Sequence, residues 1–187
     1  MKKQILLSLF LITLLFSIFS GCVNNTNVGN SDDDEIHDFT FTTLDGSIKK
    51  LSDYRGKVVI VDLWATWCGP CTYVMPELKK IYIDYNRTEL EIISIDIDTS
   101  ETVEKIEGYI SDFAEYYGIQ LNWIFARDSD NIAEKYLKDG KIPTLTIFDQ
   151  VGRLCYHEVG VHGYIEVPYG FPSDTPLLAS VLEDLIN

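Results

Sequence analysis

Two cysteines separated by two residues are the part of this sequence best suited to chemistry. Cys68 and Cys71 close the stretch WATWCGPC, and the chain has only two other cysteines, Cys22 and Cys155. A metal site would need two further cysteine or histidine ligands, and none stands at a usual spacing. A purely structural disulfide is disfavoured, because it would enclose only a tiny loop. The spacing therefore favours a redox-active pair and predicts no metal site.

The local sequence should also favour the ionised form of Cys68. A buried strand is expected to end just before it, which places Cys68 in the first turn of a helix and Pro70 at an early helical position, where its missing N–H costs nothing. The unpaired amides and the positive dipole end of a helix stabilise a thiolate. A free thiol with a pKa near 8.5 is only ~3% ionised at pH 7. We therefore expect Cys68 to attack and Cys71, one turn deeper, to be the resolving thiol.

One acid lies inside a strand that otherwise consists of buried residue types. KVVIVDLWA (57–65) is a nearly continuous β-branched apolar run, which is typical of a strand covered on both faces, and Asp62 interrupts it. Burial of an unpaired carboxylate is expensive unless its pKa rises and it holds a proton. We expect Asp62 to exchange protons with Cys71 through a water. The alternatives are a structural acid with satisfied hydrogen bonds and a position at the sheet edge.

The elements that must position these residues alternate between strands and helices. Strands are expected at 38–41, 47–51, 57–65, 90–98, 122–126, 144–149 and 153–160. A helix of about four turns should follow the cysteines, and further helices are expected at 101–118, 130–138 and 177–186. The first two strands flank Asp45-Gly46, which predicts a hairpin. This alternation implies an α/β fold in which a central sheet is flanked by helices.

The first residues are not expected to belong to that domain. Lys2 and Lys3 precede an apolar run over 5–19, which is the layout of a secretory signal and is short for a membrane span. The sequence FSGC at its end resembles a lipoprotein box. We therefore expect a lipoprotein signal peptide over 1–21 with lipidation at Cys22. An uncleaved anchor and a plain signal peptide are the alternatives, and all three place the domain outside the cytoplasm.

The remaining composition separates a tether from one domain. Residues 22–35 are mostly Asn, Ser, Thr, Gly and Asp and predict a disordered tether, whereas 36–187 are enough for one domain with a sizeable core. The formal net charge is −14. Nucleic acid and anionic lipid surfaces repel such a chain, so we expect no nucleic-acid partner and a lipid tether rather than electrostatic membrane contact.

Two segments resemble a known family. VDLWATWCGPC (61–71) resembles the active-site segment of thioredoxins, and KIPTLTIF (141–148) resembles their cis-proline loop. The longer run from DFTF to CGPC, followed by Pro76 and Glu77, resembles the membrane-anchored extracytoplasmic reductases of the TlpA/ResA type. The resemblance covers about 36–187. It implies a thioredoxin-like fold with a central mixed sheet, an N-terminal β-hairpin, and a helix and strand inserted at 101–126.

The resemblance also assigns residues around the sulfurs. It implies a cis peptide bond before Pro143, which would place the Ile142 backbone where an incoming peptide can pair with it. Trp67, Gly69 and Pro70 complete the expected substrate-contact surface.

Two positions depart from the family pattern. Many TlpA/ResA-type proteins have a glutamate three residues after the second cysteine and lack the strand acid, whereas this chain has Val74 there and keeps Asp62, as thioredoxins do. Lys141 stands where thioredoxins usually have glycine before the Ile-Pro pair.

These features predict a lipid-anchored thiol-disulfide oxidoreductase at the outer face of the cytoplasmic membrane. It would exchange a Cys68–Cys71 dithiol for disulfides in other proteins, without a metal or organic cofactor. The resemblance implies a reductase that takes electrons from a membrane thiol transporter and serves cytochrome c maturation. The alternatives are a surface-anchored binding or metallochaperone module with this fold and a peroxiredoxin-like peroxidase. Cys155, within a strand, is expected to be an inert buried thiol rather than a third redox sulfur.

Overall fold

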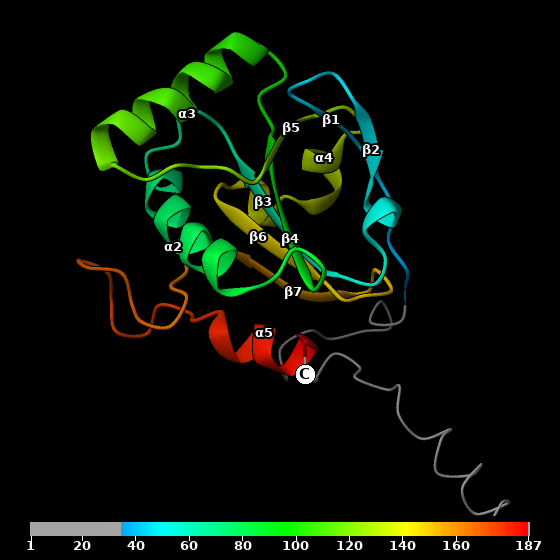
Figure 1. The fold of residues 1–187 in the computed structure, drawn as a ribbon, viewed down its shortest axis with the longest axis vertical. Helices are drawn as coiled ribbons and strands as arrows, with labels where there is room; N and C mark the ends of the chain where they lie inside the picture. The colour runs from blue at the N-terminus through cyan, green and yellow to red at the C-terminus, as the bar shows by residue number, and fades with distance from the viewer. Residues whose placement is uncertain (1–34, 187) are drawn as a thin grey trace, which may run out of the picture.

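Seven strands form one mixed sheet at the centre of the part of the chain that the computed structural model describes, residues 35–186 (Figure 1). The strands are β1 (Thr40–Thr43), β2 (Ile48–Lys50), β3 (Val58–Trp64), β4 (Leu90–Asp96), β5 (Ile124–Asp128), β6 (Thr144–Phe148) and β7 (Leu154–Val159). They lie in the order β2-β1-β5-β4-β3-β6-β7. β3 runs parallel to β4 and antiparallel to β6, so the sheet is mixed as expected.

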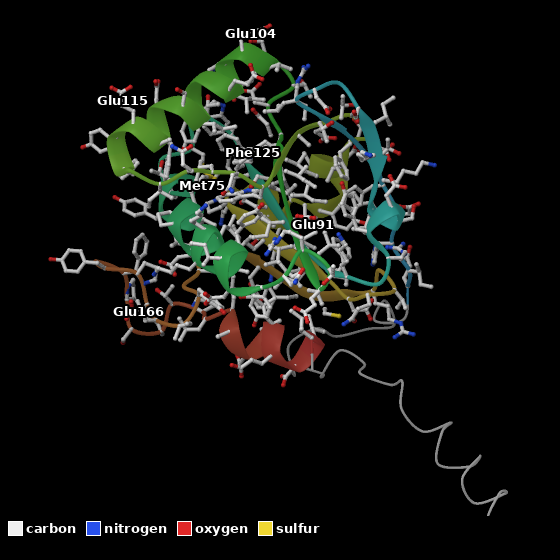
Figure 2. All side chains as sticks on the ribbon, in the orientation of Figure 1. Met75, Glu91, Glu104, Glu115, Phe125 and Glu166 are labelled. Atoms are coloured by element: carbon white, nitrogen blue, oxygen red, sulfur yellow. A yellow bond between two sulfur atoms is a disulfide. The ribbon has the colours of Figure 1, made fainter. Side chains whose placement is uncertain are left out.

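Helices cover both faces of this sheet. Within the described residues they are α2 (Cys71–Asp84), α3 (Val103–Tyr117), α4 (Ile132–Tyr136) and α5 (Ala179–Ile186), together with the 3-10 helices η1 (Leu51–Tyr54) and η2 (Lys138–Gly140). Buried side chains of α2, α3 and α5 pack into one core layer, and those of α4 and η1 pack into the layer on the opposite face. In Figure 2, Met75 of α2 and Phe125 of β5 lie inside the first layer. The α/β thioredoxin-like fold is therefore confirmed.

Both expected additions to the sheet are present. β1 and β2 pair antiparallel across a turn in which Gly46 has φ of +84°, a conformation that glycine adopts at little cost. The insert consists of α3 and β5. β5 pairs in parallel with β4 and antiparallel with β1, so the inserted strand joins the hairpin to the central strands.

The central strand β3 explains how one sequence run serves two core layers. All its residues are buried. Because successive side chains of a strand point to opposite faces, Val58, Ile60 and Trp64 pack on the side of α2 and α3. The odd-numbered side chains between them pack on the side of α4. Asp62 shares the even-numbered register, so it lies on the α2 side.

Several predictions fall on residues that the structure does not describe. The signal segment 1–21, lipidation at Cys22 and nearly all of the tether 22–35 lie outside the described residues. Within residues 35–186, no helix combines the length and the apolar character that membrane crossing requires.

The segment between β7 and α5 was not expected to pack as it does. Residues 160–178 form an irregular loop that runs past α2. The backbone N–H of Tyr164 donates to Oε2 of Glu77 at 2.9 Å, and Lys80 donates to Oε1 of the same carboxylate at 2.8 Å. Glu77 is only 4% exposed. This buried carboxylate therefore ties the loop to α2.

The loop between β4 and α3 braces the turn that precedes the cysteines. Glu101, which is 2% exposed, accepts hydrogen bonds from the backbone N–H of Thr66 at 3.1 Å and from its hydroxyl at 2.5 Å. Lys105 donates to the same carboxylate at 2.6 Å. Beside it, Trp67 Nε1 donates to Asp98 at 2.8 Å. Two consecutive residues of the turn are thus held by acids of one loop.

A second buried acid completes this brace. Asp96, at the end of β4, is 1% exposed, and its carboxyl forms a hydrogen bond with that of Glu101. Burial, together with this hydrogen bond, raises the pKa of Asp96. Burial opposes ionisation of Glu101 too, but hydrogen bonds from Asp96, Lys105 and Thr66 prevail and lower its pKa. The opposite directions of the two pKa changes favour a state in which the two carboxyls share one proton and one negative charge.

Glu101→Ala should destabilise the fold by about 2–3 kcal/mol, because it leaves the donors of Thr66 and the carboxyl of Asp96 without their partner in a partly buried site. Urea denaturation at neutral pH measures this change. Glu107→Ala, which removes an exposed acid of α3 shortly after this loop, is the matched control and should shift stability by no more than about 0.5 kcal/mol. Equal effects of the two variants would contradict the brace.

Candidate active site

Cys68 and Cys71 form a disulfide at the start of α2. The S–S bond is 2.01 Å and the Cα atoms are 5.3 Å apart. The pair lies where the buried strand β3 has ended at Trp64 and the braced turn leads into the helix. Cys68 is 5% exposed and Cys71 is fully buried. The expected pairing is confirmed, and the more accessible cysteine is the one predicted to attack.

The helix begins later than the sequence suggested. α2 starts at Cys71, and Pro70 is its N-cap. Cys68 therefore precedes the helix instead of lying in its first turn, because the residues from Ala65 to Pro70 form tight turns. The expected electrostatic contact is nevertheless present. The N–H of Cys71, the first helical residue, points at Sγ of Cys68 at 3.2 Å. The same N–H also donates to the carbonyl oxygen of Cys68 at 3.1 Å, so the amide at the helix start is shared between that oxygen and the sulfur that would carry the charge.

Asp62 lies fully buried on the side of β3 that faces α2. Its Oδ2 accepts a hydrogen bond from Ser94 Oγ at 2.9 Å, and Ser94 Oγ in turn accepts one from Trp123 Nε1 at 3.0 Å. Its Oδ1 has no hydrogen-bond partner among the described residues. Burial raises the pKa of Asp62 to about 7, and the hydrogen bond from Ser94 offsets only part of this effect. The carboxyl can therefore gain or lose a proton near neutral pH.

Ser94 and Trp123 were not identified from the sequence. Ser94 is the register partner of Asp62 on the neighbouring strand β4, so the pairing of the two strands brings the hydroxyl to the acid. Trp123 comes from the insert and reaches the same hydroxyl. Asp96 was also not identified, although the sequence contained a signal for it. Like Asp62, Asp96 is an acid within a run that predicts a buried strand.

The residues expected to contact a substrate lie in the cysteine turn itself and in the loop before β6. Trp67 is 61% exposed, and Gly69 and Pro70 are exposed next to it. On the other side, the Ile142–Pro143 bond is cis, as predicted. Thr144, the next residue, pairs with Leu63 of β3. The cis-proline loop therefore lies beside the end of the strand that leads into the cysteine turn.

Two other predicted positions have different outcomes. Val74, which occupies the place of the glutamate found in many TlpA/ResA-type proteins, is fully buried. The helix therefore offers no carboxyl at this position, and Asp62 of β3 remains the acid predicted to serve Cys71. Cys155 lies half-buried on β7, with its Sγ 3.5 Å from the carbonyl oxygen of Arg153. The side chain is therefore less buried than predicted.

The same part of the chain offers no arrangement typical of a resident metal. Within residues 35–186, no group of three or more His, Cys, Asp or Glu side chains is placed to hold an ion. The chemistry that the described site can perform is exchange between a dithiol and a disulfide, with a buried acid nearby that titrates near neutral pH.

Comparisons with known proteins agree with this chemistry. A family model described as the AhpC/TSA family matches residues 33–157. The thiol-disulfide oxidoreductase ResA of Geobacillus thermodenitrificans is 30% identical over 165 residues, which cover 82% of this chain and 87% of that protein. ResA of Geobacillus kaustophilus is 34% identical over 118 residues, and the match covers 63% of each protein, which is less than two thirds of that relative's length.

Solved structures support the fold. A structure from Bacteroides vulgatus has a TM-score of 0.60 at 22% identity, with 84% of this chain and 97% of that chain covered. The pneumococcal exposed lipoprotein thioredoxin from Streptococcus pneumoniae has a TM-score of 0.55 at 23% identity, with 80% and 100% covered. The family match, the ResA relatives and the geometry of the cysteine pair lead to one conclusion. The chain belongs to the AhpC/TSA family and is a thioredoxin-like thiol-disulfide oxidoreductase of the TlpA/ResA type.

Proposed function

We propose that this protein is a membrane-anchored reductase of protein disulfides that acts outside the cytoplasm through its CGPC dithiol. The observation that carries the proposal is the contact between the N–H of Cys71 and Sγ of Cys68, at 3.2 Å. In the reduced protein, this amide and the helix end behind it favour the thiolate of Cys68. A thiolate that is ionised at neutral pH is the species that attacks disulfides.

The reaction proceeds in two exchanges. The Cys68 thiolate attacks one sulfur of the substrate disulfide, so a Cys68–substrate bond forms, the substrate S–S bond breaks, and one substrate thiolate leaves and takes a proton. Cys71 then loses its proton and attacks Sγ of Cys68. The Cys68–Cys71 disulfide forms and the second substrate thiolate leaves. Two electrons have passed from the enzyme dithiol to the substrate, and a donor dithiol restores the enzyme by the reverse exchanges.

Asp62 accepts the proton of Cys71 in the second exchange. Its carboxyl lies on the α2 side of the sheet, as Cys71 does, and its Oδ1 carries no other hydrogen bond among the described residues. A base works best when its pKa is close to the working pH, and burial brings the pKa of Asp62 to about 7. A water between the carboxyl and the thiol would complete the path.

Substrate docking uses the two sides of the site. The Ile142 backbone beside the cis bond offers strand-like pairing to an extended peptide, and Trp67, Gly69 and Pro70 form the opposing surface. Lys141, exposed next to the cis-proline loop, adds a cation where thioredoxins usually have glycine.

The relatives support the proposed location, and the proposed electron donor rests on the family resemblance alone. One structural neighbour is an exposed lipoprotein, and the ResA proteins are thiol-disulfide oxidoreductases. Lipidation at Cys22 would hold the domain at the outer face of the cytoplasmic membrane through the segment 22–35. A membrane thiol transporter would then supply electrons, and cytochrome c maturation is the proposed process that uses them.

Cys71→Ser should trap the first intermediate, because no thiol remains to release Cys68 from the substrate. With insulin as the substrate, a covalent adduct should accumulate on a non-reducing gel and disappear with dithiothreitol. Cys68→Ser should form no adduct, and both variants should lose insulin reduction. Adduct formation through Cys71 in the Cys68→Ser variant would reverse the proposed roles, and undiminished turnover in that variant would exclude the dithiol mechanism.

Asp62→Asn should change how the stability of the oxidised protein depends on pH. The folded-state pKa of Asp62, about 7, lies above the value near 3.9 of an unfolded chain. The wild type therefore loses stability as the pH rises from about 4 to 7, by roughly 1.4 kcal/mol for each pH unit. Since the variant lacks this loss, its stability relative to wild type should grow by about 3–4 kcal/mol between pH 4 and pH 8 in urea denaturation.

Asp174→Asn is the control for this experiment, because it makes the same chemical change at an exposed position. Its stability should follow the wild-type curve. Parallel curves for wild type and Asp62→Asn across this pH range would show that the buried carboxyl keeps an ordinary pKa, and its role as the base would fail.

A further inference from the structure

A hollow beside the first turn of α2 has no part in the mechanism described above. Its volume is about 370 Å³, and we call it the tyrosine cleft. Its lining residues are Thr72, Tyr109, Asp112, Phe113, Tyr116 and Tyr117. All of them except Thr72 come from α3, the inserted helix.

The cleft begins next to the dithiol. Thr72 follows Cys71 directly, and its hydroxyl is 3.4 Å from that of Tyr109 across the gap between α2 and α3. The tyrosine cleft lies on the α3 side of the turn that carries the cysteines, whereas the cis-proline loop lies on the β6 side of that turn. A substrate chain that crosses the sulfurs from the cis-proline loop would therefore continue towards the cleft.

The aromatic rings in the cleft form one connected cluster. Ring centroids of Phe113 and Tyr117 are 4.5 Å apart, those of Tyr116 and Tyr117 are 4.7 Å apart, and those of Tyr109 and Phe113 are 6.0 Å apart. Tyr116 is 82% exposed and Tyr117 is 49% exposed. Two large aromatic side chains thus remain in water beside the redox site, where aromatic side chains commonly serve recognition.

The charges around the cleft select the kind of group that fits it. Asp112 is exposed at the cleft, and no lysine or arginine lines it. Within residues 35–186, the cations that lie over aromatic rings cover Tyr54, Tyr82 and Tyr136, and none covers a ring of the cleft. A cation bound in the cleft would gain a cation–π contact with a tyrosine ring and an ion pair with the carboxylate of Asp112.

We propose that the tyrosine cleft binds an arginine or lysine side chain of the substrate protein, close in sequence to the half-cystine that Cys68 attacks. This proposal rests on the function proposed above and names the class of substrate. An extended peptide advances about 3.3 Å for each residue. A basic residue two or three positions from the half-cystine therefore reaches a cleft that starts one residue beyond Cys71. The occupant is a basic segment of a disulfide-bearing protein.

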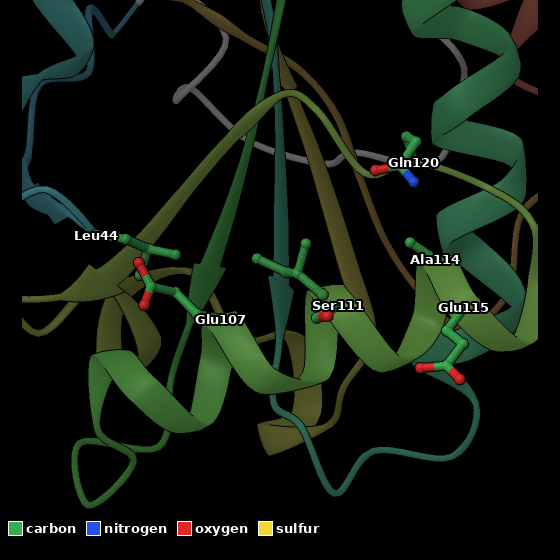
Figure 3. Close-up of a pocket in the computed structure, with 7 residues that line it drawn as sticks. Leu44, Glu107, Ser111, Ala114, Glu115 and Gln120 are labelled. Atoms are coloured by element: carbon green, nitrogen blue, oxygen red, sulfur yellow. The ribbon is translucent and has the colours of Figure 1, made fainter.

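A second hollow on α3 serves as an internal comparison. It has a volume of about 630 Å³, lies on another side of the helix and has no aromatic residue in its lining (Figure 3). Glu107 and Glu115 line it. Glu115 is exposed on the same helix as Asp112 and projects away from the body of the molecule in Figure 2. Removal of either charge changes the net charge equally, but only Asp112 belongs to the tyrosine cleft.

The test uses the reduced full-length protein and two disulfide-linked peptide dimers. One peptide carries arginine three positions from its cysteine, and the other carries glutamine there. The kcat/KM for reduction should favour the arginine peptide by about 5- to 10-fold in the wild type, as expected for a cation that gains an aromatic face and a carboxylate. Asp112→Asn and Tyr116→Ala should each reduce this preference at least 2-fold, while Tyr116→Phe and Glu115→Gln should retain it.

The outcomes separate the two proposals. Equal rates for the two peptides in the wild type would overturn the proposal for the tyrosine cleft, and so would equal effects of Asp112→Asn and Glu115→Gln. In either case, reduction of the glutamine peptide would still support the proposed function. Failure to reduce either peptide would overturn both proposals. Loss of the arginine preference in Asp112→Asn, with the glutamine peptide reduced at the wild-type rate, would support both.

Discussion

The N–H of Cys71 that points at the Cys68 sulfur is the contact on which the rest of the site depends. It exists because β3 ends at Trp64, a tight turn follows, and α2 begins at the second cysteine itself. A helix start has amides without intrahelical partners, and here the first of them faces a group that can carry negative charge. The acids of the β4–α3 loop keep this geometry in place by holding Thr66 and Trp67 from the side.

Two buried acids on neighbouring strands both have a raised pKa but have different roles. Asp62 and Asp96 lie on the same side of the sheet, and burial raises the pKa of both. Asp96 shares its proton with Glu101, so its protonated form is part of the brace. Asp62 keeps one oxygen unpartnered among the described residues, so its proton is available for exchange. The arrangement therefore separates a structural proton from the one that the proposed mechanism moves.

Local patterns were sufficient for the dithiol, the buried strand with its acid and the hairpin, because each depends on residues close together in the chain. The cis bond before Pro143 was predicted only from the family resemblance. The features that were missed depend on tertiary contacts. Ser94 donates to Asp62 because the pairing of β4 with β3 places the two residues side by side. Glu101, in the loop after β4, accepts from Thr66 in the turn after β3. α2 begins at Cys71, later than predicted, because the β4–α3 loop holds the preceding turn through contacts that the sequence does not reveal. The packing of residues 160–178 depends on Glu77, whose burial no periodicity indicates.

The most direct test of the central contact is the rate at which iodoacetamide alkylates Cys68 as a function of pH. The Cys71→Ser variant in its reduced form removes the competing thiol, and mass spectrometry of the peptide that contains Cys68 reports this site alone. If the helix start stabilises the thiolate, half-maximal rate should occur well below the value near 8.5 of free cysteine. A midpoint at or above that value would contradict the account, because the amide would then give the sulfur no advantage.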